Sequence, residues 1–236
     1  MAEPISAQPV SIVFPLYPGV THLDFTGPHQ FLARLPGATL ITASVGGAPV
    51  AADGLVFAQL ATLEAIERCD VLCVPGGQGC TDAMQDAVYM AAIRRLADGA
   101  RYVTSVCTGS LILGAAGLLR GRRATCHWAW RDLLALFGAV PDPGRVVRDG
   151  NVLTGGGVTA GIDFALTLAT ELAGPLAAQA IQLALEYAPA PPFNAGRPET
   201  APAEVLALVR ERMAPSIPAR RAAVERAAAH AGAQTR

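Results

Sequence analysis

Short apolar runs alternate with longer helical patterns along this chain, and this alternation limits the possible folds more than any other feature. It is typical of a parallel sheet covered by helices on both faces. The predicted strands are Val10–Leu16, Thr39–Val45, Val71–Val74, Arg101–Val106 and Val152–Thr154. The predicted helices are Phe25–Leu35, Met84–Ala97, Ser110–Leu119, Ala129–Phe137, Ala160–Leu172 and Pro175–Tyr187. We therefore expect an α/β fold with a mostly parallel sheet between helical layers.

The second half of the chain adds two further features. Gly150 and Asn151 separate two short apolar runs, which predicts a tight hairpin and one antiparallel strand pair. The proline-rich segment Pro189–Pro198 breaks any helix, and helical patterns resume at Ala203–Arg212 and Pro218–His230. We expect an α/β domain over residues 1–190, followed over residues 191–236 by an extended segment and helices that pack on the same domain or on a second subunit.

The composition limits where such a protein can work. The chain has 236 residues, of which 52% are hydrophobic, enough for the core of one such domain. No apolar stretch reaches the length of about 18 residues that a membrane span needs, and the N-terminal segment shows no secretory signal. The 5 cysteines form no CxxC pair, which predicts neither disulfides nor a zinc site. We expect a cytoplasmic protein with no membrane partner and no metal.

The charge gives no electrostatic reason to expect nucleic-acid binding, because the net charge is −1. Several arginines do gather near the C-terminus, interleaved with alanines on predicted helices. We expect them to form a solvated face: Arg210, Arg212, Arg220, Arg221 and Arg226.

Cys107 is the residue with the strongest indication of chemistry. A β-branched run precedes it and an apolar helical pattern follows, so strand, tight turn and helix come in the order of a nucleophile elbow. The first N–H groups of the new helix then point at the side chain, which favours thiolate over thiol and predicts a lowered pKa. A buried structural cysteine is the alternative, because free cysteines often pack as small hydrophobes.

Two other segments should converge on the same edge of the sheet, where ligands bind in open parallel sheets. Asp24 follows the first strand, and we expect its carboxyl to face the thiol with a raised pKa, as an acid and then a base; a helix N-cap is the alternative. The N–H of Gly77 can stabilise negative charge, or belong to an ordinary turn. The Thr108 hydroxyl can cap the helix or hold a catalytic water or the Asp24 carboxyl.

A glycine-rich segment, Gly155–Gly161, precedes the helix that begins near Ala160. It lacks both the Gly-Lys-Ser/Thr ending of a phosphate loop and the GxGxxG spacing, so we expect no nucleotide. It is better explained as a helix entry that brings Val158 against the pocket. His127 follows a short predicted strand and is expected to line the same cleft without a catalytic role; a hydrogen-bonded histidine at a strand end is the equal alternative.

Five segments together resemble the ThiJ/PfpI superfamily, and within it the branch that hydrates isonitriles (isocyanides). They are Leu23–Pro28, Pro75–Gly77, Val106–Ser110, Gly155–Asp163 and Glu186–Phe193, and the likeness runs through nearly the whole chain. Protease and glyoxalase-like branches usually carry glutamate where this chain has Asp24, and proteases carry histidine where it has Thr108. Peptide hydrolysis by a Cys-His pair is therefore disfavoured.

The resemblance implies a flavodoxin-like fold and a homodimeric lyase that converts an isonitrile and water into an N-substituted formamide without a metal or organic cofactor. In the expected sequence of steps Cys107 attacks the isonitrile carbon to give a thioimidate, and Asp24 then activates a water held with Thr108. Two alternatives stay open. One is a glyoxalase or deglycase-like enzyme acting on reactive carbonyls, and the other is a non-catalytic sensor in which Cys107 is oxidised.

Overall fold

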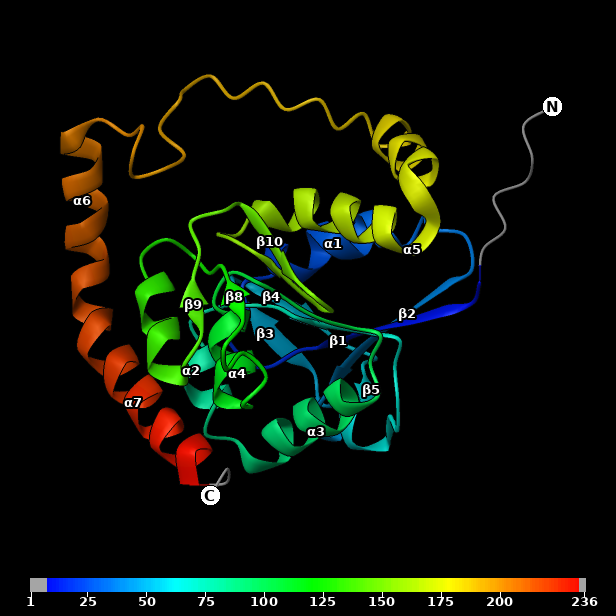
Figure 1. The fold of residues 1–236 in the computed structure, drawn as a ribbon, viewed down its shortest axis with the longest axis horizontal. Helices are drawn as coiled ribbons and strands as arrows, with labels where there is room; N and C mark the ends of the chain where they lie inside the picture. The colour runs from blue at the N-terminus through cyan, green and yellow to red at the C-terminus, as the bar shows by residue number, and fades with distance from the viewer. Residues whose placement is uncertain (1–7, 234–236) are drawn as a thin grey trace.

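The structure is a computed structural model that describes residues 8–233, and a sheet of seven strands forms its centre (Figure 1). The strand order is β10-β11-β7-β6-β1-β2-β5, and every neighbouring pair is parallel except β10 with β11. The mostly parallel sheet and the antiparallel hairpin at Gly150 and Asn151 are both confirmed. The strands are β1 (Val10–Pro15), β2 (Ala38–Ser44), β5 (Ala61–Thr62), β6 (Val71–Val74), β7 (Tyr102–Val106), β10 (Val146–Asp149) and β11 (Val152–Gly155).

Helices cover both faces of this sheet. One face carries α1 (Leu23–Leu32) packed against α5 (Ala160–Ala184), and the other carries α2 (Cys80–Ala83), α3 (Ala87–Asp98) and α4 (Gly109–Ala115) (Figure 1). Every residue of the central strands β6 and β7 is buried. A strand that is buried on both faces needs apolar residues at consecutive positions, which explains why these strands were recognisable as short unbroken apolar runs.

One predicted helix has a different geometry in the structure. The predicted helix Ala129–Phe137 is a 3₁₀ helix, η3 (Arg131–Phe137), in which Leu134 and Phe137 are buried. Residues three apart lie on the same side of a 3₁₀ helix, so this geometry turns both side chains to the core. The short elements β3 (Val50–Ala52), β4 (Leu55–Phe57), β8 (Arg123–Ala124) and β9 (Val140–Pro141) also form, with 3₁₀ turns η1 (Val45–Gly47) and η2 (Leu63–Ala65).

The helix α5 contains a sharp break. Gly174 has φ 82° and ψ 167°, and Pro175 follows it, so the helix consists of the two segments that the sequence predicts. By length and composition α5 is apolar enough to span a membrane, contrary to our expectation from the sequence. Its first segment instead packs on α1, β7 and β11 within the helical layer, which accounts for its apolar composition.

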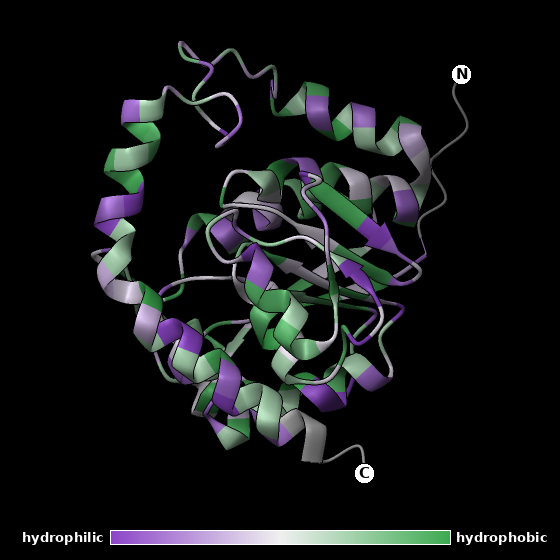
Figure 2. Cartoon of the chain, turned by 60° about the vertical axis from the view of Figure 1, so that its left-hand side comes forward, coloured by the Kyte–Doolittle hydropathy of each residue, from purple (hydrophilic) through white to green (hydrophobic). Residues whose placement is uncertain are grey.

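The C-terminal part leaves the sheet after Tyr187 and crosses the molecule as an extended segment to α6 (Ala203–Met213), a 3₁₀ turn η4 (Ala214–Ser216) and α7 (Ile217–Ala233) (Figure 1). Hydrophilic and hydrophobic residues alternate along α6 and α7 (Figure 2). The helix α6 buries no side chain, whereas α7 packs on α2, α4 and η3. One prediction is wrong here: Arg220 is only 3% exposed and is not part of a solvated face. The domain boundary near residue 190 stays a prediction.

Candidate active site

Cys107 lies at the junction between β7 and α4, in the strand, turn and helix order that the sequence predicts. Its φ is +57°, a left-handed conformation that a non-glycine residue adopts at an energetic cost. Its N–H donates to the carbonyl oxygens of Gly155 at 3.0 Å and Gly156 at 2.8 Å. A side chain at Gly109 would approach the Val74 carbonyl oxygen to 2.1 Å, so the turn requires glycine there. These contacts fix the thiol at the carboxyl edge of the sheet.

Asp24 comes from the first turn of α1 and is fully buried. Its Oδ2 accepts a hydrogen bond of 2.9 Å from the Gly76 N–H, whereas its Oδ1 is buried and has no hydrogen-bond partner among residues 8–233. The helix N-cap is His22, so the alternative of Asp24 as a capping residue is not what the structure contains. A carboxyl held by one oxygen keeps the other free for a proton.

The pKa values of this pair follow from burial. Burial raises the pKa of Asp24 to about 7, and the Gly76 N–H and the nearby Cys107 thiol offset part of that rise. The raised pKa agrees with our expectation from the sequence. At neutral pH Asp24 therefore exists in comparable amounts as acid and carboxylate, which suits a group that must give and take a proton.

The pKa of the Cys107 thiol differs from the one that the sequence predicts. Burial raises its pKa well above the ordinary value, the Asp24 carboxylate and Cys126 raise it further, and the backbone N–H groups of Val158 and Thr108 lower it. Full burial can raise a thiol pKa by about 3–5 units. A helix N-terminus stabilises the thiolate by roughly 0.3–2 kcal/mol, which is a smaller effect because one pKa unit corresponds to about 1.4 kcal/mol. The prediction of a lowered pKa in the free site was thus wrong, because burial outweighs the helix. The thiol needs a base, and Asp24 is beside it.

Thr108 connects this pair to the turn after β6. Its Oγ1 accepts a hydrogen bond of 2.9 Å from the Gly77 N–H and lies 3.2 Å from the Gly77 carbonyl oxygen, to which it donates. The hydroxyl makes no capping bond to α4. We expected the Gly77 N–H to face the reacting group; in the structure this donor is instead taken up by Thr108. A side chain at Gly76 would lie 2.4 Å from the Thr108 backbone nitrogen and 2.8 Å from Asp24 Oδ2. Gly76 is therefore packed against both Thr108 and Asp24.

His127 and Val158 border a pocket of about 820 Å³ beside this junction. Cys107 does not line this pocket, but two residues that contact it do: Gly156, whose carbonyl accepts the Cys107 N–H, and Val158, whose N–H lies beside the thiol. The His127 Nδ1 accepts a hydrogen bond of 3.3 Å from the Ala129 N–H, as in the alternative of a strand-end histidine. Burial, helped by Arg220, lowers the His127 pKa to about 4. The neutral ring can line the pocket but cannot form an ion pair with a thiolate.

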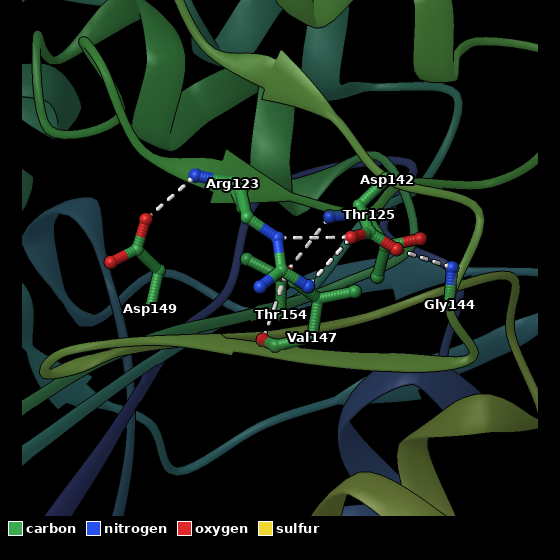
Figure 3. A network of polar contacts seen from close by, with 7 residues as sticks. All are labelled: Arg123, Thr125, Asp142, Gly144, Val147, Asp149 and Thr154. Carbon is green, nitrogen blue, oxygen red and sulfur yellow. Dashed lines mark hydrogen bonds and ion pairs between the residues drawn. The ribbon is translucent and has the colours of Figure 1, made fainter.

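A polar network holds the segment that carries His127 (Figure 3). Arg123 forms an ion pair with Asp142 at 2.8 Å, and its N–H donates to Asp149. The Thr125 N–H donates to Oγ1 of Thr154 on β11, and the Thr125 carbonyl accepts from Ser110 on α4 at 2.6 Å. The segment before His127 is therefore fixed to both the sheet and the helix that follows Cys107.

Sequence reasoning brought together Asp24, Cys107 and Thr108 and placed Val158 and His127 at the border of the site. It missed Gly76 as the donor to Asp24 and the carbonyls of Gly155 and Gly156 as acceptors for Cys107. Gly76 itself was the available signal, since a side chain has no room there. No signal in the sequence distinguished Arg220 from its exposed neighbours.

Comparisons with known proteins show the family of this chain. Residues 10–171 match the DJ-1/PfpI family. The chain is 54% identical over 221 residues to an isonitrile hydratase of Pseudomonas putida, an alignment that covers 93% of this chain and 97% of that protein.

Solved structures show the same architecture. A ThiJ/PfpI family protein from Pseudomonas syringae superposes with a TM-score of 0.88 at 43% identity, covering 94% of this chain and 91% of that one. Drosophila melanogaster DJ-1beta superposes with a TM-score of 0.69 at 25% identity, covering 77% of this chain and 100% of that one. The first of these likenesses extends over the C-terminal segment as well as the sheet.

Proposed function

This chain belongs to the DJ-1/PfpI family, and from that premise we propose that it is an isonitrile hydratase, which adds water to R–NC to give an N-substituted formamide. The observation that carries the proposal is the buried pair at the elbow: a thiol of raised pKa beside a carboxyl whose Oδ1 lacks a partner among the described residues. The identity of 54% to a protein of this activity supports the same assignment.

The first step joins Cys107 to the isonitrile carbon. Asp24 takes the thiol proton, the sulfur lone pair forms a bond to the terminal carbon, and Asp24 returns the proton to that carbon. The product is a thioimidate, R–N=CH–S–Cys107. The step requires that Cys107 and Asp24 carry one proton between them. Near neutral pH they do so as a thiol and a carboxylate.

The second step hydrolyses the thioimidate. Asp24, ionised again, takes a proton from a water molecule as the water oxygen bonds to the same carbon, and Asp24 passes this proton to the nitrogen. The C–S bond of the tetrahedral intermediate then breaks as Asp24 takes the proton of its hydroxyl group, the formamide leaves, and Asp24 returns that proton to the sulfur. We assign the placing of this water to Asp24 Oδ1 and to Thr108, whose hydroxyl oxygen lies on the same side of Gly76 as the Asp24 carboxyl.

The substituent of the isonitrile is proposed to lie in the pocket bordered by Val158, His127 and Trp128. The volume of about 820 Å³ leaves room for aromatic as well as small aliphatic substituents. Because Nδ1 of the neutral His127 ring accepts from Ala129, we assign the ring proton to Nε2, where it can donate to a bound ligand.

We also propose that the protein is a cytoplasmic homodimer. Exposed apolar side chains on the C-terminal part support a second subunit: Leu183 is 82% exposed and Phe193 is 79% exposed. The five cysteines are free and buried, in keeping with a reducing compartment. Light scattering tests the dimer, and a monomer at all accessible concentrations would contradict it.

The function is tested by measuring formamide production from an aromatic and an aliphatic isonitrile with the purified protein. Cys107→Ser and Asp24→Asn are the variants, and Cys73→Ser, a buried cysteine in β6, controls for loss of any thiol. We expect turnover by the parent protein and by Cys73→Ser, and none above background by the two site variants. Mass spectrometry of the acid-quenched enzyme should find the substrate mass added at Cys107.

Two results would contradict the proposal. Turnover that persists in Cys107→Ala would exclude the covalent step. A parent protein that is inactive on both isonitriles, while Cys107 is oxidised once per chain without turnover, would favour the sensor.

A further inference from the structure

Arg220 on α7 is an unusual buried cation. Its side chain is 3% exposed, and no Asp or Glu among residues 8–233 forms an ion pair with it. Its Nε is buried without a hydrogen-bond partner within the same residues. A buried charge without a counter-ion destabilises a fold, and an apolar side chain of similar size would pack there at lower cost. Stability alone therefore does not explain an arginine at this position.

The contacts of Arg220 connect two segments that each contribute to the site. Its guanidinium donates a hydrogen bond of 2.6 Å to Gln78 and lies 4.5 Å from the centre of the Trp130 ring. Gln78 directly follows Gly76 and Gly77, the donors to Asp24 and Thr108. The Trp130 N–H donates to the His127 carbonyl at 2.9 Å. One guanidinium thus joins the turn that orients the acid to the turn that borders the pocket.

The rest of α7 supports the same arrangement. It packs on α2, α4 and η3, each of which begins shortly after a site segment ends. The turn Pro75–Gly77 leads into α2, Cys107 into α4 and His127 into η3. Within Ile217–His230, Ala223, Val224 and Ala227 are also buried and supply the apolar contact of α7.

Resting on the proposed function, we infer that Arg220 is a positioning residue for isonitrile hydration, holding the Gly76–Gln78 turn and the His127–Trp130 turn at a fixed separation. It touches neither substrate nor reacting atoms. Its charge faces three titratable groups: Cys80 of α2, Cys126 and His127, and it lowers the pKa of each of them. It thereby helps to keep the His127 ring neutral.

The test compares two variants. Arg220→Met keeps the length of the side chain but removes the charge and the planar guanidinium with its N–H donors, whereas Arg220→Lys keeps the charge. Arg221→Met is the matched control, because Arg221 is exposed and, within residues 8–233, pairs only with Glu225 at 3.8 Å. Displacement of a site group by about 1 Å can lower activity 100-fold. We expect Arg220→Met to lower kcat by about 10- to 100-fold, with little change in KM, Arg220→Lys to recover part of it, and Arg221→Met to match the parent.

The melting temperature distinguishes a positioning role of Arg220 from a role in packing alone. Because Arg220→Met removes an uncompensated buried charge and Gln78 can be solvated, we expect its Tm to equal or exceed that of the parent. We expect Gln78→Ala to add no further loss of kcat in the Arg220→Met background. A Tm that falls in parallel with kcat, or a kcat within twofold of the parent, would overturn the inference.

A second readout does not depend on hydratase activity. The rate at which iodoacetamide alkylates Cys107 is followed against pH, and in Arg220→Met the midpoint should move to higher pH, since Asp24 loses the fixed Gly76 donor. A shift in Arg220→Met alone, with no formamide made by any form, would refute the proposed function and keep the positioning role. Formamide production with superimposable alkylation profiles would refute the positioning role and keep the function.

Discussion

The N–H of Gly76 donates a 2.9 Å hydrogen bond to Oδ2 of Asp24, and Oδ1 of the same carboxyl is left buried without a hydrogen-bond partner among residues 8–233. One oxygen is fixed by the backbone and the other is free to exchange a proton with the Cys107 thiol or with water. Burial keeps the pKa of this carboxyl at about 7, so the exchange operates near neutral pH. The relationship gives Asp24 both an orientation and a suitable proton affinity.

The pH dependence of activity should follow this carboxyl. The attacking form of the site holds one proton shared between Cys107 and Asp24, so kcat/KM should rise with pH through an apparent pKa of about 7. It should then stay level to high pH, because the pKa of the thiol is raised well above its ordinary value. Initial rates in buffers of constant ionic strength measure the profile. A profile that falls between pH 6 and 8 would contradict the assignment of Asp24 as the base.

Stability should depend on pH in the opposite sense. The pKa of Asp24 is about 7 in the folded protein, against about 3.9 for an unfolded aspartate. Between these values the unfolded chain has released the proton and the folded one keeps it, so stability contributed by Asp24 falls as pH rises from about 4 to about 7.

Asp24→Asn removes this dependence and should be the more stable protein above pH 7, by at most about 4 kcal/mol for a shift of about three units. Urea denaturation at pH 5 and pH 8 measures the difference, with Asp98→Asn, a substitution of an exposed aspartate in α3, as control. Equal pH slopes for Asp24→Asn and the parent protein would show that Asp24 does not titrate in this range.

Local patterns in the sequence predicted most of the fold. The central strands β6 and β7 are buried on both faces, so their apolar runs were unambiguous, and the turn at Cys107 combined a β-branched strand with small residues. Gly174 and Pro175 likewise separated two helical segments in advance. Such features depend on residues close together in the chain, which is why one sequence was enough to find them.

Long-range contacts were beyond reach of the sequence. In the sequence Arg220 and Arg221 stand side by side in the same alanine-rich helical pattern. Only the packing of α7 on the turn at Gln78 distinguishes the buried Arg220 from the exposed Arg221. The pKa of Cys107 was predicted in the wrong direction for the same reason. The helix N-terminus is a local feature, whereas the burial that outweighs it comes from several distant segments.

The Thr108 hydroxyl should matter for stability as well as activity. Thr108→Val removes the acceptor of the Gly77 N–H and leaves that buried donor unpaired, at a cost of about 1–3 kcal/mol. Thr108→Ser keeps the hydroxyl and should stay close to the parent in both Tm and kcat/KM. Thermal unfolding and formamide assays on the two variants measure the effect. If Thr108→Val and Thr108→Ser behave alike, the bond to Gly77 has no part in the site.

Gly76 should be among the residues least tolerant of substitution. In Gly76→Ala the new methyl group would lie 2.4 Å from the Thr108 backbone nitrogen and 2.8 Å from Asp24 Oδ2, so the turn has to move away from α4 and from the carboxyl that it orients. We expect kcat/KM to fall by about 100-fold or more and the free energy of unfolding by about 1–3 kcal/mol.

Gly99→Ala is the matched control for Gly76→Ala, because a side chain there would meet nothing within 4 Å. Its kcat/KM should equal that of the parent. The measurement is kcat/KM beside a pH profile, since loss of the Gly76 donor should also move the apparent pKa of Asp24 above 7. Activity lost in Gly76→Ala with an unmoved apparent pKa would mean that the turn serves the pocket and not the orientation of Asp24.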